Sequence, residues 1–192
     1  MALTRLKNII TSRTGRLIYV NPDDFDASDA IDNRGNSPLR PFKSLQRALL
    51  EVARFSYRGG KGNDEFDAYS ILLHPSDYII DNRPGKGSFS GTLQDIPTLN
   101  ANSNFDLLDP SNDLYKFNTT TGGCVVPRGC SIVGLDLRRT KIIPKYVPFP
   151  YGVADGAPEG FTEQPRSSIF NVTGGCYMWQ FSIFDGHDLG VY

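Results

Sequence analysis

A short segment near the C-terminus combines side chains that could act as acid, base or ligand. Asp185, His187 and Asp188 lie next to one another in the sequence Asp-Gly-His-Asp. Carboxylates beside an imidazole can transfer protons, which is the chemistry of polysaccharide lyases and hydrolases. Asp-Gly is also a frequent turn, and a polar turn after the apolar segment 179–184 explains the same residues. We favour the turn, and a catalytic role is the second interpretation.

A second group of carboxylates follows the first apolar segment of the chain. Asp23, Asp24 and Asp26 are candidate calcium ligands, because hard cations prefer clustered oxygen atoms. Their order does not match an EF-hand, which requires a glycine at the sixth loop position and a glutamate at the twelfth. Aspartate also favours turns by accepting hydrogen bonds from nearby backbone N–H groups, and we expect that role here. We predict no metal and no other cofactor.

The cysteines and histidines do not form a recognisable site. Cys124, Cys130 and Cys176 are odd in number, and His74 and His187 lie far apart in the chain. This favours reduced thiols buried in a core, in a protein made in a cytoplasm, over a disulfide framework or a zinc site.

Composition excludes several classes of function. The net charge of −1 offers no electrostatic reason to bind nucleic acid. An apolar run long enough to span a membrane is absent from the sequence, so we expect no membrane partner. The motifs of phosphate-binding loops, dinucleotide sites, nucleophile elbows and zinc proteases are also missing, so we predict that the chain is not an enzyme.

The element that must organise these residues is an amphipathic helix predicted over 41–56, with Pro41 at its first position. Its apolar residues recur three or four positions apart and form one face: Phe42, Leu45, Leu49, Val52 and Phe55. Charged residues surround the rest of the helix: Lys43, Arg47, Glu51 and Arg54. Such a face must lie on an apolar surface, and we expect it to close the end of a stack of strands.

Short segments with strand character fill most of the remaining chain. They lie at 17–20, 69–74, 77–80, 123–127, 130–135, 140–144, 168–172 and 177–184, between turn-forming residues. Two of the runs are similar, GGCVVPRGCSIVGLD at 122–136 and GGCYMWQFSIFDG at 174–186. Repeated strand–turn units that cannot bury their apolar faces alone are typical of a solenoid, and a β-sandwich is the alternative.

Three further segments favour contacts with other subunits. Residues 1–16 form a basic arm with apolar anchors, which we expect to dock on a neighbouring protein: Leu3, Leu6, Ile9 and Ile10. The insertions 82–121 and 146–166 are long for loops of a compact domain. The second insertion offers rigid aromatic anchors: Tyr146, Phe149, Tyr151 and Phe161. The same rings could stack on a host surface glycan.

Two segments carry a resemblance to a known family. IYVNPDDFDASDAIDNRGNSPLRPFKSLQRAL resembles the entry segment of right-handed parallel β-helix proteins of the pectate-lyase-like group, and AYSILLHPSDYII is similar to their first coil. Ser76 replaces the glycine that this family usually has in the turn before the tyrosine. The resemblance implies an all-β dominated fold, a single-stranded parallel β-helix over 17–192 in which helix 41–56 caps the N-terminal end.

From TRLKNIITS onward the chain also resembles structural proteins of the tail or baseplate of contractile-tailed cyanobacterial phages. This resemblance implies a virion protein of a phage tail, baseplate or tail fibre that binds other tail proteins, with a homotrimer favoured. Strand character continues to the last residues, so we expect further polypeptide or other subunits to cover that end. The alternatives are a tailspike-like depolymerase and a carbohydrate-binding module.

Overall fold

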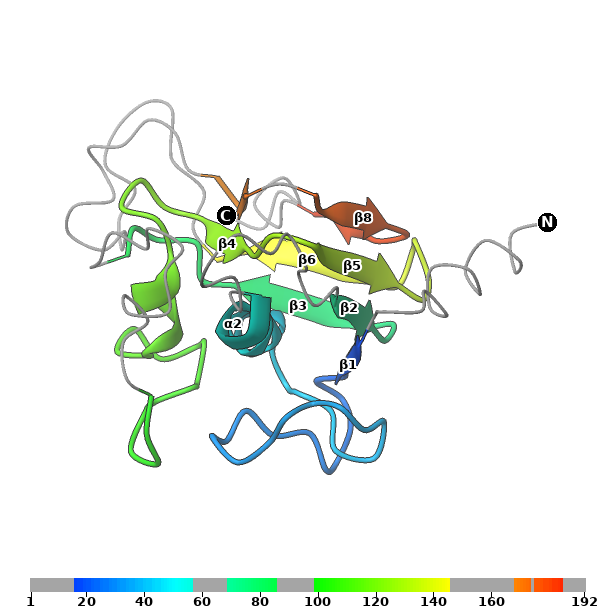
Figure 1. Ribbon diagram of the computed structural model, residues 1–192, viewed down its shortest axis with the longest axis horizontal. Coiled ribbons are helices and arrows are strands. Elements are labelled where there is room, and N and C mark those ends of the chain that lie inside the picture. Colours follow the sequence, from blue (N-terminus) through cyan, green and yellow to red (C-terminus); the bar gives the residue numbers. More distant parts are fainter. Residues whose placement is uncertain (1–15, 57–68, 86–98, 146–167, 174, 185–192) are drawn as a thin grey trace, which may run out of the picture.

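The computed structural model describes residues 16–56, 69–85, 99–145, 168–173 and 175–184, with the backbone alone at 54–56. These residues form a strand-rich structure with one α-helix (Figure 1). The strands are β1 (Arg16–Val20), β2 (Tyr69–Leu73), β3 (Asp77–Ile80), β4 (Cys124–Val126), β5 (Cys130–Gly134), β6 (Lys141–Pro144), β7 (Phe170–Val172), β8 (Tyr177–Trp179) and β9 (Ser182–Ile183). The helices are α2 (Leu45–Ser56) and a 3-10 helix, η2 (Leu114–Phe117).

The strands form three sheets in which every pairing between named strands is parallel. The large sheet has the order β1-β2-β5-β8, the middle sheet β3-β6-β9 and the small sheet β4-β7. The chain enters the small, large and middle sheets in that order through β4, β5 and β6, and again through β7, β8 and β9. A β-sandwich of the kind considered as the alternative is built from antiparallel sheets, so this pairing differs from it.

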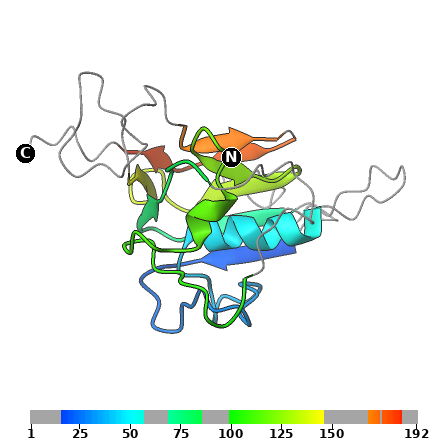
Figure 2. The ribbon, with the colours of Figure 1, turned by 90° about the vertical axis from the view of Figure 1, so that its left-hand side faces the viewer.

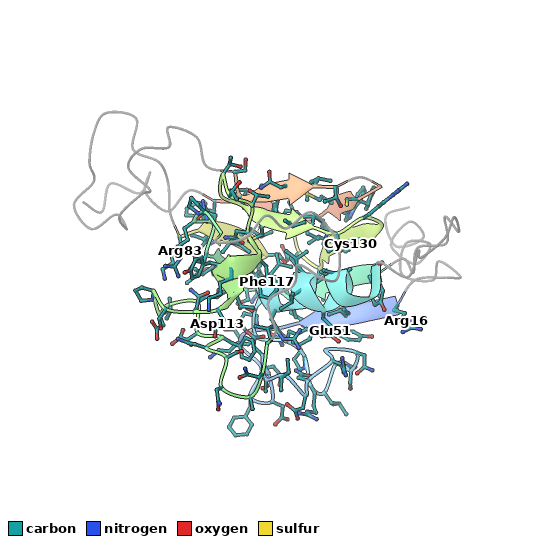
Figure 3. The ribbon with its side chains drawn as sticks, turned by 60° about the vertical axis from the view of Figure 1, so that its left-hand side comes forward. Arg16, Glu51, Arg83, Asp113, Phe117 and Cys130 are labelled. Carbon is teal, nitrogen blue, oxygen red and sulfur yellow. The ribbon has the colours of Figure 1, made fainter. Side chains whose placement is uncertain are left out.

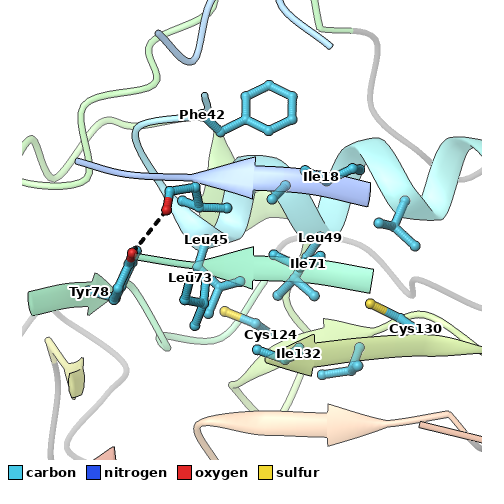
Figure 4. Close-up of a cluster of buried hydrophobic side chains, with 14 of the residues drawn as sticks. Ile18, Phe42, Leu45, Leu49, Ile71, Leu73, Tyr78, Cys124, Cys130 and Ile132 are labelled. Carbon is cyan, nitrogen blue, oxygen red and sulfur yellow. Dashed lines mark hydrogen bonds between the residues drawn. The ribbon is translucent and has the colours of Figure 1, made fainter. Parts of the chain in front are cut away.

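Apolar side chains of successive strands lie one above another, because the parallel register continues without a break across the sheet. In the large sheet Ile18 pairs with Ile71, Ile71 with Ile132, and Ile132 with Met178. The three isoleucines are buried in the main apolar cluster, which Figure 4 shows between the strands and α2. Strand residues on either side of this column point outward, as the alternation of a strand requires.

Helix α2 packs beside the strands near the β1 end of the stack (Figures 1 and 2). It begins at Leu45, not at Pro41 as predicted. Ser44 is its N-cap, because the Ser44 hydroxyl accepts a hydrogen bond from the Arg47 N–H at 3.2 Å. Phe42 cannot be helical because its backbone is bound to β1: Phe42 N donates to Tyr19 O at 2.8 Å, and Phe42 O accepts from Asn21 N at 2.9 Å.

The predicted apolar face of the helix is confirmed for the residues whose side chains are described, and the side chain of Phe55 lies outside them. Four of its members are buried in the main cluster: Phe42, Leu45, Leu49 and Val52. Two of the charged residues on the rest of the helix, Arg47 and Glu51, are also buried, with side chains 0% and 2% exposed. The reason is tertiary, since residues 21–40 fold back over this side of the helix. Lys43, before the helix, is exposed.

Part of the first insertion packs on its own domain. Leu107, Leu114 and Phe117 bury their side chains against Leu50 of α2 in a second apolar cluster. These side chains are therefore used within the chain, residues 86–98 lie outside its described part, and a contact of this loop with another subunit stays a prediction. Turns stiffen this loop, since Asn104, Asp106 and Asp109 each accept a hydrogen bond from the N–H two positions later.

The C-terminal strand segment differs from the prediction in two respects. Residues 177–184 form two strands, not one, because Gln180 adopts a left-handed backbone with φ 59° and turns the chain between them. The two similar cysteine-containing runs also align in another register. Ser131 pairs with Tyr177, which places Cys176 beside Cys130 and not beside Cys124.

Candidate functional site

The predicted catalytic residues Asp185, His187 and Asp188 lie outside the described residues. The same holds for the predicted interface residues of the arm and of the second insertion: Leu3, Leu6, Ile9, Ile10, Tyr146, Phe149, Tyr151 and Phe161.

The candidate calcium ligands lie in a turn of the loop after β1. Asp24 Oδ1 accepts a hydrogen bond from Asp26 N at 2.9 Å, and the Asp23 and Asp26 side chains are exposed. This is the expected turn chemistry. Among the residues that the structure describes, no group of three or more His, Cys, Asp or Glu side chains is placed to hold a metal ion.

The three cysteines are free thiols. Cys124 and Cys130 are buried in the main cluster, as predicted, and burial raises the pKa of both thiols. Cys176 is partly buried and donates to the carbonyl oxygen of Pro127 at 3.2 Å. Thiols with raised pKa values are poor nucleophiles, so Cys124 and Cys130 serve as small apolar core residues.

The β1 edge of the large sheet is closed by the loop that leads to α2. Tyr19 N donates to Gly35 O at 2.7 Å, and Phe42 continues the pairing on the same edge. Gly35 has φ +60°, and a Cβ atom there would lie 2.3 Å from the Phe42 ring, so only glycine fits. Hydrogen bonds to Gly35 and Phe42 thus satisfy the Tyr19 N–H, the Tyr19 carbonyl oxygen and the Asn21 N–H at this edge.

A buried polar network ties the same loop to the helix (Figure 3 labels Glu51). Arg47 donates from Nη1 to Glu51 Oε2 at 3.0 Å, from Nε to Asp29 O at 3.2 Å and from Nη2 to Asn33 O at 3.3 Å. Arg34 also pairs with Glu51, at 2.8 Å. The Arg47 guanidinium lies 4.6 Å from the centre of the Phe42 ring. Each buried charge therefore has a partner.

Asp29 supports the start of the helix. One carboxylate oxygen, Oδ1, accepts hydrogen bonds from Lys43 N at 2.9 Å and from Ser44 N at 3.0 Å. Burial raises the pKa of Asp29, and the hydrogen bonds from Ser44 and Lys43, together with the charge of Arg47, oppose that rise. This carboxylate is structural, because all its contacts serve the chain's own backbone and cap.

A groove of about 830 Å³ opens between the loop after β1 and residues 101–108. Its lining mixes charged and apolar side chains: Asp32, Lys43, Asp77, Phe105, Asp106 and Leu108. Its acidic residues have local partners, since Asp32 pairs with Arg40 at 3.4 Å, Asp77 with Lys141 at 4.0 Å, and Asp106 accepts a backbone hydrogen bond from Leu108. These three carboxylates therefore take part in local ion pairs and a turn.

The opposite end of the stack has a different character. Strands β7, β8 and β9 are the last strands of the three sheets within the described residues. Inward-facing residues that pair with one another from strand to strand form columns. In each sheet, one such column ends there on an exposed apolar residue. Val172, Met178 and Ile183 are 54%, 36% and 55% exposed, whereas the residues that they pair with, Val126, Ile132 and Ile142, are all 0% exposed.

This end is the candidate functional surface, and we call the exposed residues Val172, Met178 and Ile183 the column ends. Unpaired strand edges with exposed apolar side chains are a template for association with another chain. Sequence reasoning located the strands but missed these residues. The alternation of side chains along each strand predicts which residues face inward. Only the register of the strand pairing shows which of them ends a column.

Comparisons with known proteins give no further guide to this surface. No protein-family model, curated protein or solved structure matches the chain. In the part of the chain with described coordinates, the helices are too short or too polar to cross a membrane.

Proposed function

We propose that the protein is a structural component of a phage tail, baseplate or tail fibre, which assembles with other virion proteins through the column ends. In this proposal the three sheets are the faces of a right-handed single-stranded parallel β-helix, and α2 is its N-terminal cap. The observation that carries the proposal is the contrast between the 36–55% exposure of the column ends and the 0% exposure of the residues that they pair with, Val126, Ile132 and Ile142.

The energetics favour covering this end. Burial of apolar surface contributes about 25 cal/mol per Å², and strand edges gain hydrogen bonds when another backbone pairs with them. Residues 35–42 bond to the outer edge of β1 and α2 packs beside it, which supports placing the contacts along the axis of the stack at the opposite end. A protein with one closed and one adhesive end suits a part placed at a defined position in a particle.

The resemblance of the entry segment and of the N-terminal arm supports the virion setting. The arm would dock on a neighbouring tail protein, and a homotrimer is the proposed arrangement of copies. Free, buried thiols fit synthesis in the cytoplasm of the host.

Light scattering after size-exclusion chromatography tests the proposal. We expect the chain to associate well above the 21.3 kDa of one copy, and the Val172→Lys/Ile183→Lys variant to shift toward that mass. Phe25→Lys is the matched control, because Phe25 is fully exposed at the opposite end, in the loop after β1. A monomeric parent chain, or a double variant that associates as the parent does, would contradict the proposal.

A further inference from the structure

The first strand of the middle sheet has an outer edge that no described strand covers. Among the described strands, β3 pairs with β6 alone. The Ile80 carbonyl oxygen accepts from Lys145 N at 2.8 Å, so it points toward β6. Main-chain groups of successive residues in a parallel strand point to opposite edges. The N–H and C=O groups of Asp77 and Ile79 therefore point to the outer edge.

The structure closes one part of this edge and leaves another part open. Asp81, directly after β3, is bonded to the helix, because Gln46 Oε1 accepts from Asp81 N at 2.7 Å. Within the described residues, no main-chain hydrogen bond joins Asp77 or Ile79 to the loop that faces them. Both residues line the groove of about 830 Å³ described above. An open strand edge inside a groove can bind an extended peptide as an added strand.

The walls of the groove suit a single extended segment. Residues 27–32 line it together with β3, so an added strand would lie between this loop and β3, and the sheet would grow no further. Apolar side chains are available along it, since Ile79 is 36% exposed and Leu108 is 66% exposed. Main-chain hydrogen bonds and apolar contacts can thus act on the same segment.

The charges at the groove favour a basic segment. Asp32, Asp77 and Asp106 line it and are exposed, whereas Lys43 is the one exposed cation among the described residues of the lining. Asp32 and Asp77 pair with neighbouring cations, at 3.4 and 4.0 Å, but these pairs are exposed. Exposed ion pairs contribute little, so both carboxylates can still accept an arginine or lysine from another segment.

The arm that precedes β1 has the matching chemistry. Residues 1–15 contain three Lys or Arg and no Asp or Glu. In an extended segment Leu6 and Ile10 fall on one face, and Arg5 and Lys7 fall on the other. One face can therefore contact the apolar side chains of the groove while the other meets its carboxylates.

We propose that the groove binds residues 1–15 of a second copy of the chain, as a strand added to β3. The arm of the same copy is poorly placed for this, because β1 begins at Arg16 and the groove lies beyond the other end of β1, where Pro22 lines it. Passing each arm to the groove of the next copy closes a ring, as the proposed homotrimer requires. The inference rests on the proposed docking of the arm and names its receptor, and it makes no use of the column ends.

A full-length variant with a disabled arm leaves the groove open for a test peptide. Arg5→Glu/Lys7→Glu/Arg13→Glu reverses the charge of the arm. We would titrate a peptide of residues 1–15, labelled with fluorescein at its C-terminus, with this variant and follow the anisotropy. We expect saturable binding, and at least tenfold weaker binding of a peptide with the same residues in scrambled order. The absence of saturable binding, or equal binding of both peptides, would overturn the proposal.

Substitutions in the groove test the role of its charges. Adding Asp77→Lys/Asp106→Lys to the arm-disabled variant should weaken peptide binding at least tenfold, because two attractive charges become repulsive. Asp23→Lys/Asp26→Lys makes the same change at exposed carboxylates outside the groove and should leave binding unchanged. Equal effects of the two pairs would overturn the groove as the site.

The pairing with β3 has its own test at Ile79. Ile79→Pro removes an N–H that an added strand would use, and an edge strand tolerates proline where its N–H faces away from the sheet. Ile79→Ala keeps the N–H and removes most of the side chain. We expect the proline variant to bind the peptide more weakly than the alanine variant, with circular dichroism confirming that both are folded. Equal binding by two folded variants would overturn strand addition, and the charge substitutions decide the site if the proline variant does not fold.

A mixture of two variants shows whether the arm comes from a second copy. The arm-disabled chain lacks Lys7, and the full-length chain with Asp77→Lys/Asp106→Lys lacks the two groove carboxylates. A carbodiimide joins amines to carboxylates in contact, so a link from Lys7 to Asp77 or Asp106 in this mixture can only join two chains. We expect this link by mass spectrometry. Its absence from the mixture, with or without its presence in the parent chain, would overturn exchange between copies.

The column ends provide a separate control. Val172→Lys/Ile183→Lys changes strands outside the groove and should leave peptide binding unchanged. Failure of the peptide to bind, while these two substitutions still reduce self-association, would refute the groove alone. Peptide binding in a chain whose self-association ignores them would refute assembly through the column ends alone.

Discussion

Strands β1 and β8 are the two outer strands of the same sheet, and their surroundings differ completely. The outer edge of β1 is bonded to Gly35 and Phe42, and α2 covers the interior beside it. Within the described residues, β8 has a pairing partner on one side only. The apolar column that begins at Ile18, which is 2% exposed, ends at Met178, which is 36% exposed.

The difference shows that a parallel stack does not close itself. Each strand pairs its backbone N–H and C=O groups with the strand before it, and leaves unpaired groups on its other edge for the strand that follows. One end of this molecule meets the requirement with a helix, a loop and a buried ion pair. Within the described residues, the other end has no such cover, and we propose that it binds another chain.

The largest effect is expected from disrupting the helical cap. Leu45→Asp/Leu49→Asp should abolish folding, because both side chains lie in the main cluster, 0% and 3% exposed, and two buried carboxylates would have no partner there. Circular dichroism measures the outcome. Leu39→Asp, in the loop before the helix and 78% exposed, should fold normally. A folded double variant would show that α2 does not seal the stack.

The second-largest loss of stability is expected when the buried Arg47 is replaced. Arg47→Met leaves Glu51 and two backbone carbonyls without this donor, and we expect a loss of about 3–5 kcal/mol in the free energy of unfolding. Arg34 still pairs with Glu51, which places the loss toward the lower figure. Urea denaturation gives the value. The matched variant Arg40→Met breaks an exposed pair with Asp32 and should cost under about 1 kcal/mol. Similar losses in the two variants would refute the role of the network.

Two truncations in one column compare the middle of the stack with its end. Ile132→Ala should cost about 2–5 kcal/mol, as for a fully buried residue. Met178→Ala, one strand further along, should cost clearly less in dilute protein, because its side chain is already 36% exposed. Denaturation at low concentration makes the comparison. Equal losses would mean that the β8 end is as well covered as the interior.

The smallest effect concerns the pH dependence of stability at the closed end. Burial raises the pKa of Asp29 above its ordinary value of 3.8, so the folded chain keeps this proton to a higher pH than the unfolded chain. The stability contributed by this proton is complete below pH 3.8 and is lost as pH rises through the folded pKa. Asp29→Asn should remove that decline while its amide oxygen still accepts from Lys43 and Ser44.

Unfolding free energies measured as a function of pH would test this. The decline in stability is expected above pH 3.8, the ordinary pKa of the carboxyl group. Asp32→Asn, an exposed carboxylate of the same loop, is the control and should keep the slope of the parent. An unchanged slope in Asp29→Asn would assign the pH dependence to other groups.

Local patterns predicted much of this fold. The spacing of Phe42, Leu45, Leu49 and Val52 predicts the buried helix face, and turn residues predict strand bounds to within a few positions. Patterns failed where a distant segment decides the outcome. Pro41 and Phe42 are held by β1, Arg47 is covered by the loop before the helix, and Gln180 breaks a strand over Gly134.

The candidate surface was less predictable than the fold. The strands β7, β8 and β9 were expected from composition, but nothing in their residues distinguishes Met178 from Ile132 as an end of a column. The predicted site residues in the arm, in the second insertion and at 185–188 remain predictions.

By itself, the sequence determined which segments become strands, which face of the helix is apolar and that two of the thiols are core residues, because these depend on side chains near in the chain. Only the tertiary structure decided the parallel register, the burial of Arg47 and Glu51, and the exposure of Val172, Met178 and Ile183. The physical reason is that exposure depends on what lies above a residue, and in a stack of parallel strands that neighbour comes from a distant part of the chain.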